Sequence, residues 1–173
     1  MKYFWMIGVA FVLGGCVAPS YRNSGVAISS QAIDPARYAG LWYEIARFPV
    51  AFQRGCRETT AQYGVVDADT LSVVNTCRKG GPQGELDQVV GVGEITGPGQ
   101  LKVSFDSVPF IAADYWVLWV DDAYQTAVVG VPSGRAGWVL SRESNPSIAR
   151  QQQALQVLRA NGYDTSKLIF TEH

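Results

Sequence analysis

The chain has 173 residues, with 14 basic and 15 acidic side chains and a formal net charge of −1 at pH 7. It contains no block of basic residues, so nucleic-acid binding by neutralisation of phosphates is not expected. Residues 34–173 have the length of one domain that can bury a hydrophobic core.

Residues 1–15 are predicted to be a secretion signal. Lys2 supplies the positive charge, and the apolar run at residues 3–13 is too short for a comfortable membrane span. The run ends in Leu13-Gly14-Gly15-Cys16, which resembles the lipobox of bacterial lipoproteins. This resemblance implies that Cys16 becomes the first residue of the mature chain and carries a diacylglycerol and an acyl chain, a stable anchor. The alternative is an ordinary signal peptide with an incidental cysteine.

The residue that follows Cys16 predicts in which membrane the protein is anchored. In the lipoprotein family an aspartate after the cysteine favours the inner membrane, so Val17 favours the outer membrane, with the domain facing the periplasm. Residues 16–33 are predicted to form the lipidated cysteine and a flexible tether, because they are mostly small and polar. The chain from Cys16 onward has 13 basic and 15 acidic residues, a net charge of −2.

Cys56 and Cys77 remain once Cys16 is assigned to the lipid. An oxidising compartment permits a disulfide between them, which would close a loop of about 20 residues and contribute about 3 kcal/mol. The alternative is two free thiols on neighbouring strands. Two cysteines and the single His173 do not suffice for a structural zinc site, and neither a metal nor a cofactor is expected.

The rest of the chain is predicted to form mainly short strands separated by turns. Asp34 is predicted to cap a helical turn that has Pro35 at its first position. A helix is predicted between Asn145 as N-cap and Gly162 near its C-terminus, packed outside the strands. A short strand at 167–171 follows it. The eight main strands are predicted at 41–48, 58–66, 70–78, 88–95, 101–105, 115–120, 126–131 and 137–142. Their short connections favour an all-β fold, an eight-stranded antiparallel up-and-down barrel.

The run Gly40-Leu41-Trp42-Tyr43-Glu44-Ile45-Ala46-Arg47-Phe48-Pro49 resembles the first signature of the lipocalin family, in the extended form of its bacterial members. A second signature matches only partly, at Asp121-Asp122-Ala123-Tyr124. A third is an arginine after the last barrel strand, here Arg142. The resemblance covers residues 31–173. It implies a calyx for apolar molecules, with Arg142 lying across Trp42 at the closed end in a structural role.

The resemblance and strand alternation together predict which side chains line the calyx. The lining is mostly apolar with a few polar groups, as in a pocket for a fatty acyl chain. The predicted lining residues are Glu44, Ala46, Thr59, Ala61, Tyr63, Val73, Asn75, Val89, Gly91, Val103, Phe105, Tyr115, Val117, Trp119, Val128 and Trp138. An eight-stranded barrel can instead be filled by its own side chains, and a β-bulge would reverse the direction of the residues beyond it.

Two interpretations of Glu44 are open. Both follow from the need of a carboxylate inside an apolar barrel for a partner. Glu44 is either a structural group paired with Arg47 or a tyrosine, or a contact for a polar lipid head. Aromatic side chains at Phe52 and Phe110 are predicted at the open rim, where they would close over a ligand or touch a membrane.

The expected function is an outer-membrane-anchored lipocalin that binds and stores or transports fatty acids or lysophospholipids for membrane maintenance. Catalysis is not expected, since the folded body has neither a histidine nor a Gly-x-Ser-x-Gly elbow. A free Cys56 or Cys77 would be the remaining nucleophile. The alternative function is an envelope structural or interaction lipoprotein with a filled barrel. If the chain self-associates, a homodimer is the expected form.

Overall fold

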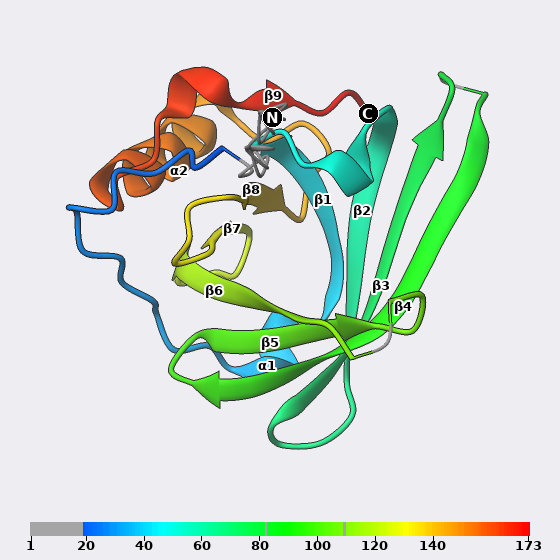
Figure 1. Ribbon diagram of the computed structural model, residues 1–173, viewed down its shortest axis with the longest axis horizontal. Helices are drawn as coiled ribbons and strands as arrows, with labels where there is room; N and C mark the ends of the chain where they lie inside the picture. Colours follow the sequence, from blue (N-terminus) through cyan, green and yellow to red (C-terminus); the bar gives the residue numbers. More distant parts are fainter. Residues whose placement is uncertain (1–18, 82, 109) are drawn as a thin grey trace, which may run out of the picture.

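The computed structural model of the chain describes residues 19–81, 83–108 and 110–173. It confirms the predicted all-β barrel of eight antiparallel strands, to which a short ninth strand is added (Figure 1). The elements in chain order are α1 (Pro35–Tyr38), β1 (Gly40–Arg47), the 3-10 turn η1 (Ala51–Gln53), β2 (Cys56–Val65), β3 (Thr70–Lys79), β4 (Glu85–Gly97), β5 (Gln100–Phe105), β6 (Ala112–Val120), β7 (Thr126–Gly130), β8 (Gly137–Ser141), α2 (Ile148–Ala160), the 3-10 turn η2 (Thr165–Lys167) and β9 (Ile169–Phe170).

Strand β1 closes the barrel by pairing on both of its edges. Its first half, Gly40–Tyr43, pairs with β2, and its other edge pairs with β8. Along the second half of β1, β9 takes the place of β2 as the pairing strand, with Ala46 opposite Phe170. The backbone N–H of Glu58 in β2 donates to the carbonyl of Glu172 at 2.9 Å. The C-terminal segment therefore fills the gap that opens between β1 and β2.

The two ends of the barrel differ. The helical turn α1 covers one end, the closed end, with the Tyr38 side chain fully buried beneath it. Asp34 caps this turn as predicted, accepting hydrogen bonds from the N–H groups of Ala36 and Arg37. The β1–β2, β3–β4, β5–β6 and β7–β8 connections lie at the opposite end, which we call the mouth. The β3–β4 hairpin reaches farthest there (Figure 1, green).

Strand alternation produces two hydrophobic cores. The inner core fills the barrel and includes Trp42, Leu71 and Leu101. The outer core lies between the barrel wall and α2 and includes Phe48, Leu158 and other residues. The N-cap of the helix lies two residues later than predicted, because the Ser147 hydroxyl rather than the Asn145 side chain accepts the hydrogen bond from the Arg150 N–H.

Residues 19–33 lie against the barrel, although the sequence predicts a flexible tether there. The backbone N–H of Tyr21 donates to the Gly134 carbonyl at 2.7 Å, and that of Gln31 donates to Val117 at 2.8 Å. The Tyr21 ring also stacks on Phe48 at 5.0 Å. The segment is thus fastened along the outer wall from the mouth to α1 (Figure 1, blue). Composition alone does not reveal these contacts, because the partners of the segment are distant in the sequence and meet it only on the folded barrel.

The predicted signal peptide and lipidation site, with Cys16, fall outside the described residues. Within residues 19–81, 83–108 and 110–173, no helix is both long and apolar enough to cross a membrane.

Candidate ligand-binding site in the barrel interior

The floor of the interior is sealed by Trp42 and Arg142. The guanidinium carbon of Arg142 lies 3.9 Å from the centroid of the Trp42 ring. Its Nη1 donates to the Leu41 carbonyl and its Nη2 to the Ala39 carbonyl, both at 2.7 Å. Gly40 permits this approach, since its φ is +100° and an added Cβ would lie 3.1 Å from Arg142 Nη1.

A cluster of three tyrosines lies above the floor. The Tyr115 hydroxyl is 2.8 Å from the hydroxyl of Tyr38 and 2.8 Å from that of Tyr63. Burial raises the pKa of Tyr63 to about 12 and raises the pKa values of Tyr38 and Tyr115 well above 10. All three phenols therefore stay protonated and neutral at physiological pH.

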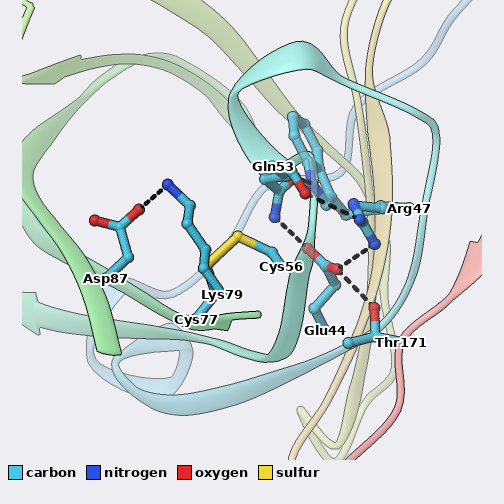
Figure 2. Close-up of a disulfide and its surroundings, with 9 residues drawn as sticks. Glu44, Arg47, Gln53, Cys56, Cys77, Lys79, Asp87 and Thr171 are labelled. Carbon is cyan, nitrogen blue, oxygen red and sulfur yellow. Dashed lines mark hydrogen bonds and ion pairs between the residues drawn. A yellow bond between two sulfur atoms is a disulfide. The ribbon is translucent and has the colours of Figure 1, made fainter. Parts of the chain in front are cut away.

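A second polar cluster lies nearer the mouth, around the buried carboxylate of Glu44 (Figure 2). Thr171 donates to Glu44 Oε1 at 2.6 Å, and Gln53 Nε2 donates to Oε2 at 2.6 Å. Arg47 forms an ion pair with Glu44 at 3.4 Å and donates to the Gln53 carbonyl. The Gln53 side chain in turn accepts from Trp138 Nε1 at 3.0 Å. Of the two readings of Glu44, these contacts support the structural one.

The disulfide between Cys56 and Cys77 is present, with a Cα–Cα distance of 5.4 Å (Figure 2). It joins the mouth ends of β2 and β3, beside the ion pair of Lys79 with Asp87. No group of three or more His, Cys, Asp and Glu side chains among the described residues could hold a metal ion.

Most of the predicted lining residues face inward. Several belong to the inner core or pack against it, and Asn75, Val89 and Gly91 share the inner face through their cross-strand partners. Thr59 is buried in β2, and its hydroxyl has no hydrogen-bond partner among the described residues. The inward-facing residues are Glu44, Ala61, Tyr63, Val73, Asn75, Val89, Gly91, Val103, Phe105, Tyr115, Val117 and Trp138. Their role as ligand contacts stays a prediction.

Three predicted lining residues, Ala46, Trp119 and Val128, instead belong to or pack against the outer core. The register of β1 against β8 shifts between Glu44 and Ala46, and that of β6 against β7 shifts between Val117 and Trp119. Each shift inserts one residue and reverses the faces beyond it.

Val128 pairs with Trp119 across β6 and β7 and therefore faces outward with it. Its neighbours Ala127 and Val129 point into the barrel.

Sequence reasoning missed several interior residues. Leu71 and Leu101 each lie two residues before a predicted lining residue, Val73 and Val103, and so share its face; continuing the alternation to the start of those predicted strands would have found them. Gln53 lies in a turn, and its buried position depends on the β1–β2 connection folding back over the mouth. Gly91 creates no free space, because an added Cβ would lie 2.9 Å from the Phe105 ring.

The two halves of the interior differ in solvent exposure. Side chains near the closed end, such as Tyr38, Trp42 and Leu71, are fully buried. Inward-facing side chains nearer the mouth are only partly buried; these are Asn75, Val89, Phe105 and Trp138. Tyr115, which lies opposite Leu101 between the two halves, is also partly exposed. The closed half is thus a packed core, and solvent reaches the inner wall of the mouth half.

Two cavities lie at the edge of the barrel. One of about 480 Å³ lies between residues 19–26 and the end of α2, and includes Arg159 and Lys167. The other, of about 230 Å³, lies at the seam between β2 and β9 and is bordered by Arg47 and Arg57. The ion pair of Arg57 with Glu172 spans this seam.

Comparison with known proteins agrees with this geometry. Residues 33–173 match the family model described as a lipocalin-like domain. The chain belongs to the lipocalin family. Proteins of this family are in general binding or carrier proteins rather than enzymes.

The outer membrane lipoprotein Blc of Escherichia coli K12 is 35% identical over 168 residues, which cover 94% of this chain and 91% of that protein. Temperature-induced lipocalin-1 of Arabidopsis thaliana is 34% identical over 145 residues, covering 80% and 78%. Rabbit (Oryctolagus cuniculus) apolipoprotein D is 28% identical over 175 residues, covering 95% and 86%.

Solved structures share the same fold. Insecticyanin of the tobacco hornworm Manduca sexta superposes with a TM-score of 0.70 at 22% identity, covering 90% of this lipocalin and 87% of that chain. Lobster apocrustacyanin A1 gives 0.69 at 16% identity, covering 90% and 92%.

Proposed function

We propose that this lipocalin binds small lipids, fatty acids or lysophospholipids, in the mouth half of its barrel, and that it is held at the outer membrane by lipidated Cys16. The observation that carries the ligand site is the exposure of its inner wall. Phe105 and Trp138 point inward near the mouth yet stay partly exposed, whereas Trp42 and Leu71 near the closed end are fully buried. An apolar wall that opens to solvent at one end suits an acyl chain.

The charges of the site favour a ligand with a large apolar body. The carboxylate of Glu44 and the guanidinium of Arg47 neutralise each other within the mouth. A ligand in the mouth half would contact mostly aromatic and aliphatic side chains. It would also meet a few polar side chains, such as Asn75, that can form hydrogen bonds. A charged head group keeps its hydration if it stays at the rim, in keeping with lysophospholipids whose acyl chain enters first.

The proposed anchor would hold the mouth near the bilayer. Ser20 and Tyr21 are hydrogen-bonded to Ser133 and Gly134 in the β7–β8 connection at the mouth. Only residues 17–19 separate Cys16 from Ser20, the first residue of this fastened segment, so the two residues can be at most roughly 14 Å apart. The exposed apolar rim at this end, including Phe52 at 68% and Ile111 at 63% exposure, would then lie beside the membrane as an entry route for lipid.

Native mass spectrometry tests the ligand site directly. A soluble Cys16→Ala variant is delipidated and incubated with an extract of envelope lipids from the bacterium that expresses it. We expect a discrete mass increase that corresponds to one fatty acid or lysophospholipid per chain. A folded protein that acquires no lipid would contradict the proposal and would favour an envelope interaction protein with a filled barrel.

The anchor needs its own test. We expect metabolic labelling with a radioactive or clickable palmitate analogue to mark the wild-type chain in a Gram-negative envelope and not the Cys16→Ala variant. Wild-type protein that carries no label would contradict the anchor and leave the ligand proposal untouched.

A further inference from the structure

The three clustered tyrosines come from separate elements and meet hydroxyl to hydroxyl. Tyr38 ends α1, Tyr63 lies on β2 and Tyr115 lies on β6. Both oxygen–oxygen distances to Tyr115 are 2.8 Å, so the Tyr115 hydroxyl is the central member. Ring contacts fix the phenols in place, with centroids 5.3 Å apart for Tyr38 and Tyr63 and 6.2 Å apart for Tyr63 and Tyr115.

The three hydroxyl groups of this cluster carry more hydrogen atoms than there are hydrogen bonds between them. Three neutral phenols carry three O–H donors, and two oxygen–oxygen contacts use two of them. The third hydrogen has no partner among the described residues. A phenol oxygen accepts two hydrogen bonds, so Tyr38 and Tyr63 can both donate to Tyr115. In that arrangement the free hydrogen belongs to Tyr115.

The solvent exposure of the three side chains also favours the arrangement in which the free hydrogen belongs to Tyr115. Tyr38 and Tyr63 are buried, at 0% and 4% exposure, whereas Tyr115 is partly exposed. The Tyr115 ring stacks on Trp138 at 6.4 Å, on the mouth side of the cluster. A ligand that enters from the mouth thus reaches Tyr115 before the other two phenols.

We infer that the Tyr115 hydroxyl is a deep polar subsite, which donates a hydrogen bond to an uncharged oxygen, a carbonyl or hydroxyl, at the buried end of an apolar ligand. This inference rests on the proposed function, because it assumes that apolar molecules enter the mouth half. It adds to that proposal a preference among ligands of equal apolar size.

The preference for an uncharged oxygen follows from the nearest cations. The guanidinium of Arg47 is paired with Glu44. The guanidinium of Arg142 donates its hydrogen bonds to the backbone carbonyls of Arg37, Tyr38, Ala39, Leu41 and Tyr124. A carboxylate beside Tyr115 would lose its hydration without gaining a free positive charge. A ketone, ester or alcohol oxygen carries a far smaller desolvation cost.

The test compares three probes of equal chain length: a long-chain alkane, the corresponding methyl ketone and the corresponding carboxylate. Each is titrated into the soluble Cys16→Ala protein, which serves as the wild type here, and into the same protein carrying Tyr115→Phe or Tyr43→Phe. Tyr43 is the matched control, since it packs against the outer core. For the wild type and Tyr43→Phe we expect the ketone to bind about five- to tenfold more tightly than the alkane. Tyr115→Phe should remove this difference and leave alkane affinity unchanged.

Infrared spectroscopy supplies a second readout that does not depend on affinity. The carbonyl stretch of a ¹³C-labelled ketone should shift to lower frequency on binding to the wild type, and this shift should be absent in Tyr115→Phe. Equal binding of ketone and alkane by the wild type, with no carbonyl shift, would overturn the subsite while leaving the lipid-binding function intact. Failure of all three probes to bind would contradict the proposed function itself.

Discussion

Arg142 and Trp42 form the structural lock at the closed end, with the guanidinium carbon 3.9 Å from the indole centroid. Trp42 lies on the first barrel strand and Arg142 directly follows the last, so they are far apart in the sequence, yet closure of the barrel brings β1 and β8 side by side. Trp42 is fully buried and donates from Nε1 to the Tyr38 carbonyl at 2.8 Å. The pair thus joins the first strand, the last strand and the turn that covers the floor.

Removal of this lock should destabilise the protein. For Arg142→Ala we expect a loss of about 2–4 kcal/mol in the free energy of unfolding, because the cation–π contact and several carbonyl partners disappear together. Arg142→Lys should retain part of the stability, since it keeps the charge but not the planar fork. Urea denaturation followed by tryptophan fluorescence measures both. A loss below 1 kcal/mol in the alanine variant would show that the lock is dispensable.

The buried pair of Glu44 and Arg47 should behave as one unit. Glu44→Ala leaves the guanidinium buried without its carboxylate, and we expect it to cost about 3–5 kcal/mol. The double variant Glu44→Leu/Arg47→Met should lose less than the sum of the single variants. Asp114→Asn serves as control, because its 2.7 Å ion pair with Lys102 is half exposed and should contribute less than about 1 kcal/mol. Denaturation curves that show additive losses would contradict the coupling.

The disulfide should contribute measurably to stability. Its cysteines are 21 residues apart, and in the chain-entropy model such a loop contributes about 3 kcal/mol. We expect Cys56→Ser/Cys77→Ser to lower the urea midpoint, and a reducing agent to lower the wild-type midpoint to a similar value. The double variant should not respond to the reducing agent. A thiol titration of the unfolded, unreduced wild-type protein should find neither cysteine free.

The buried tyrosines predict a loss of stability in alkali. Burial raises the pKa of Tyr63 to about 12, while an unfolded tyrosine titrates near 10. Above pH 10 the unfolded chain releases this proton before the folded chain does. The free energy of unfolding should therefore be insensitive to Tyr63 below about pH 10 and fall as pH rises toward 12. Unfolding at a series of pH values checks this. Tyr63→Phe should show a shallower fall, and an unchanged slope would contradict the assignment.

The apolar rim should affect lipid uptake rather than stability. Phe110 is fully exposed and Phe52 is 68% exposed at the mouth. We expect Phe52→Ser/Phe110→Ser to slow loading from phospholipid vesicles at least severalfold, with an unchanged urea midpoint. Val66→Ser is the control, because Val66 is 60% exposed at the closed end. Equal loading rates in all three proteins would rule out the rim as an entry route.

The fold class, the eight barrel strands to within a few residues and a candidate disulfide between Cys56 and Cys77 could be predicted from the sequence, and the family resemblance implied the contact of Arg142 with Trp42. The strands follow from local alternation and turn residues, the disulfide from the number of cysteines, and the contact from two signatures, so none of them requires the folded chain. The remaining features depend on how the strands pair. Bulges beyond Glu44 and Val117 turned Ala46 and Trp119 outward, since a register shift depends on the partner strand. The tyrosine cluster and the contact of Thr171 with Glu44 join distant segments, and only closure of the barrel brings them together.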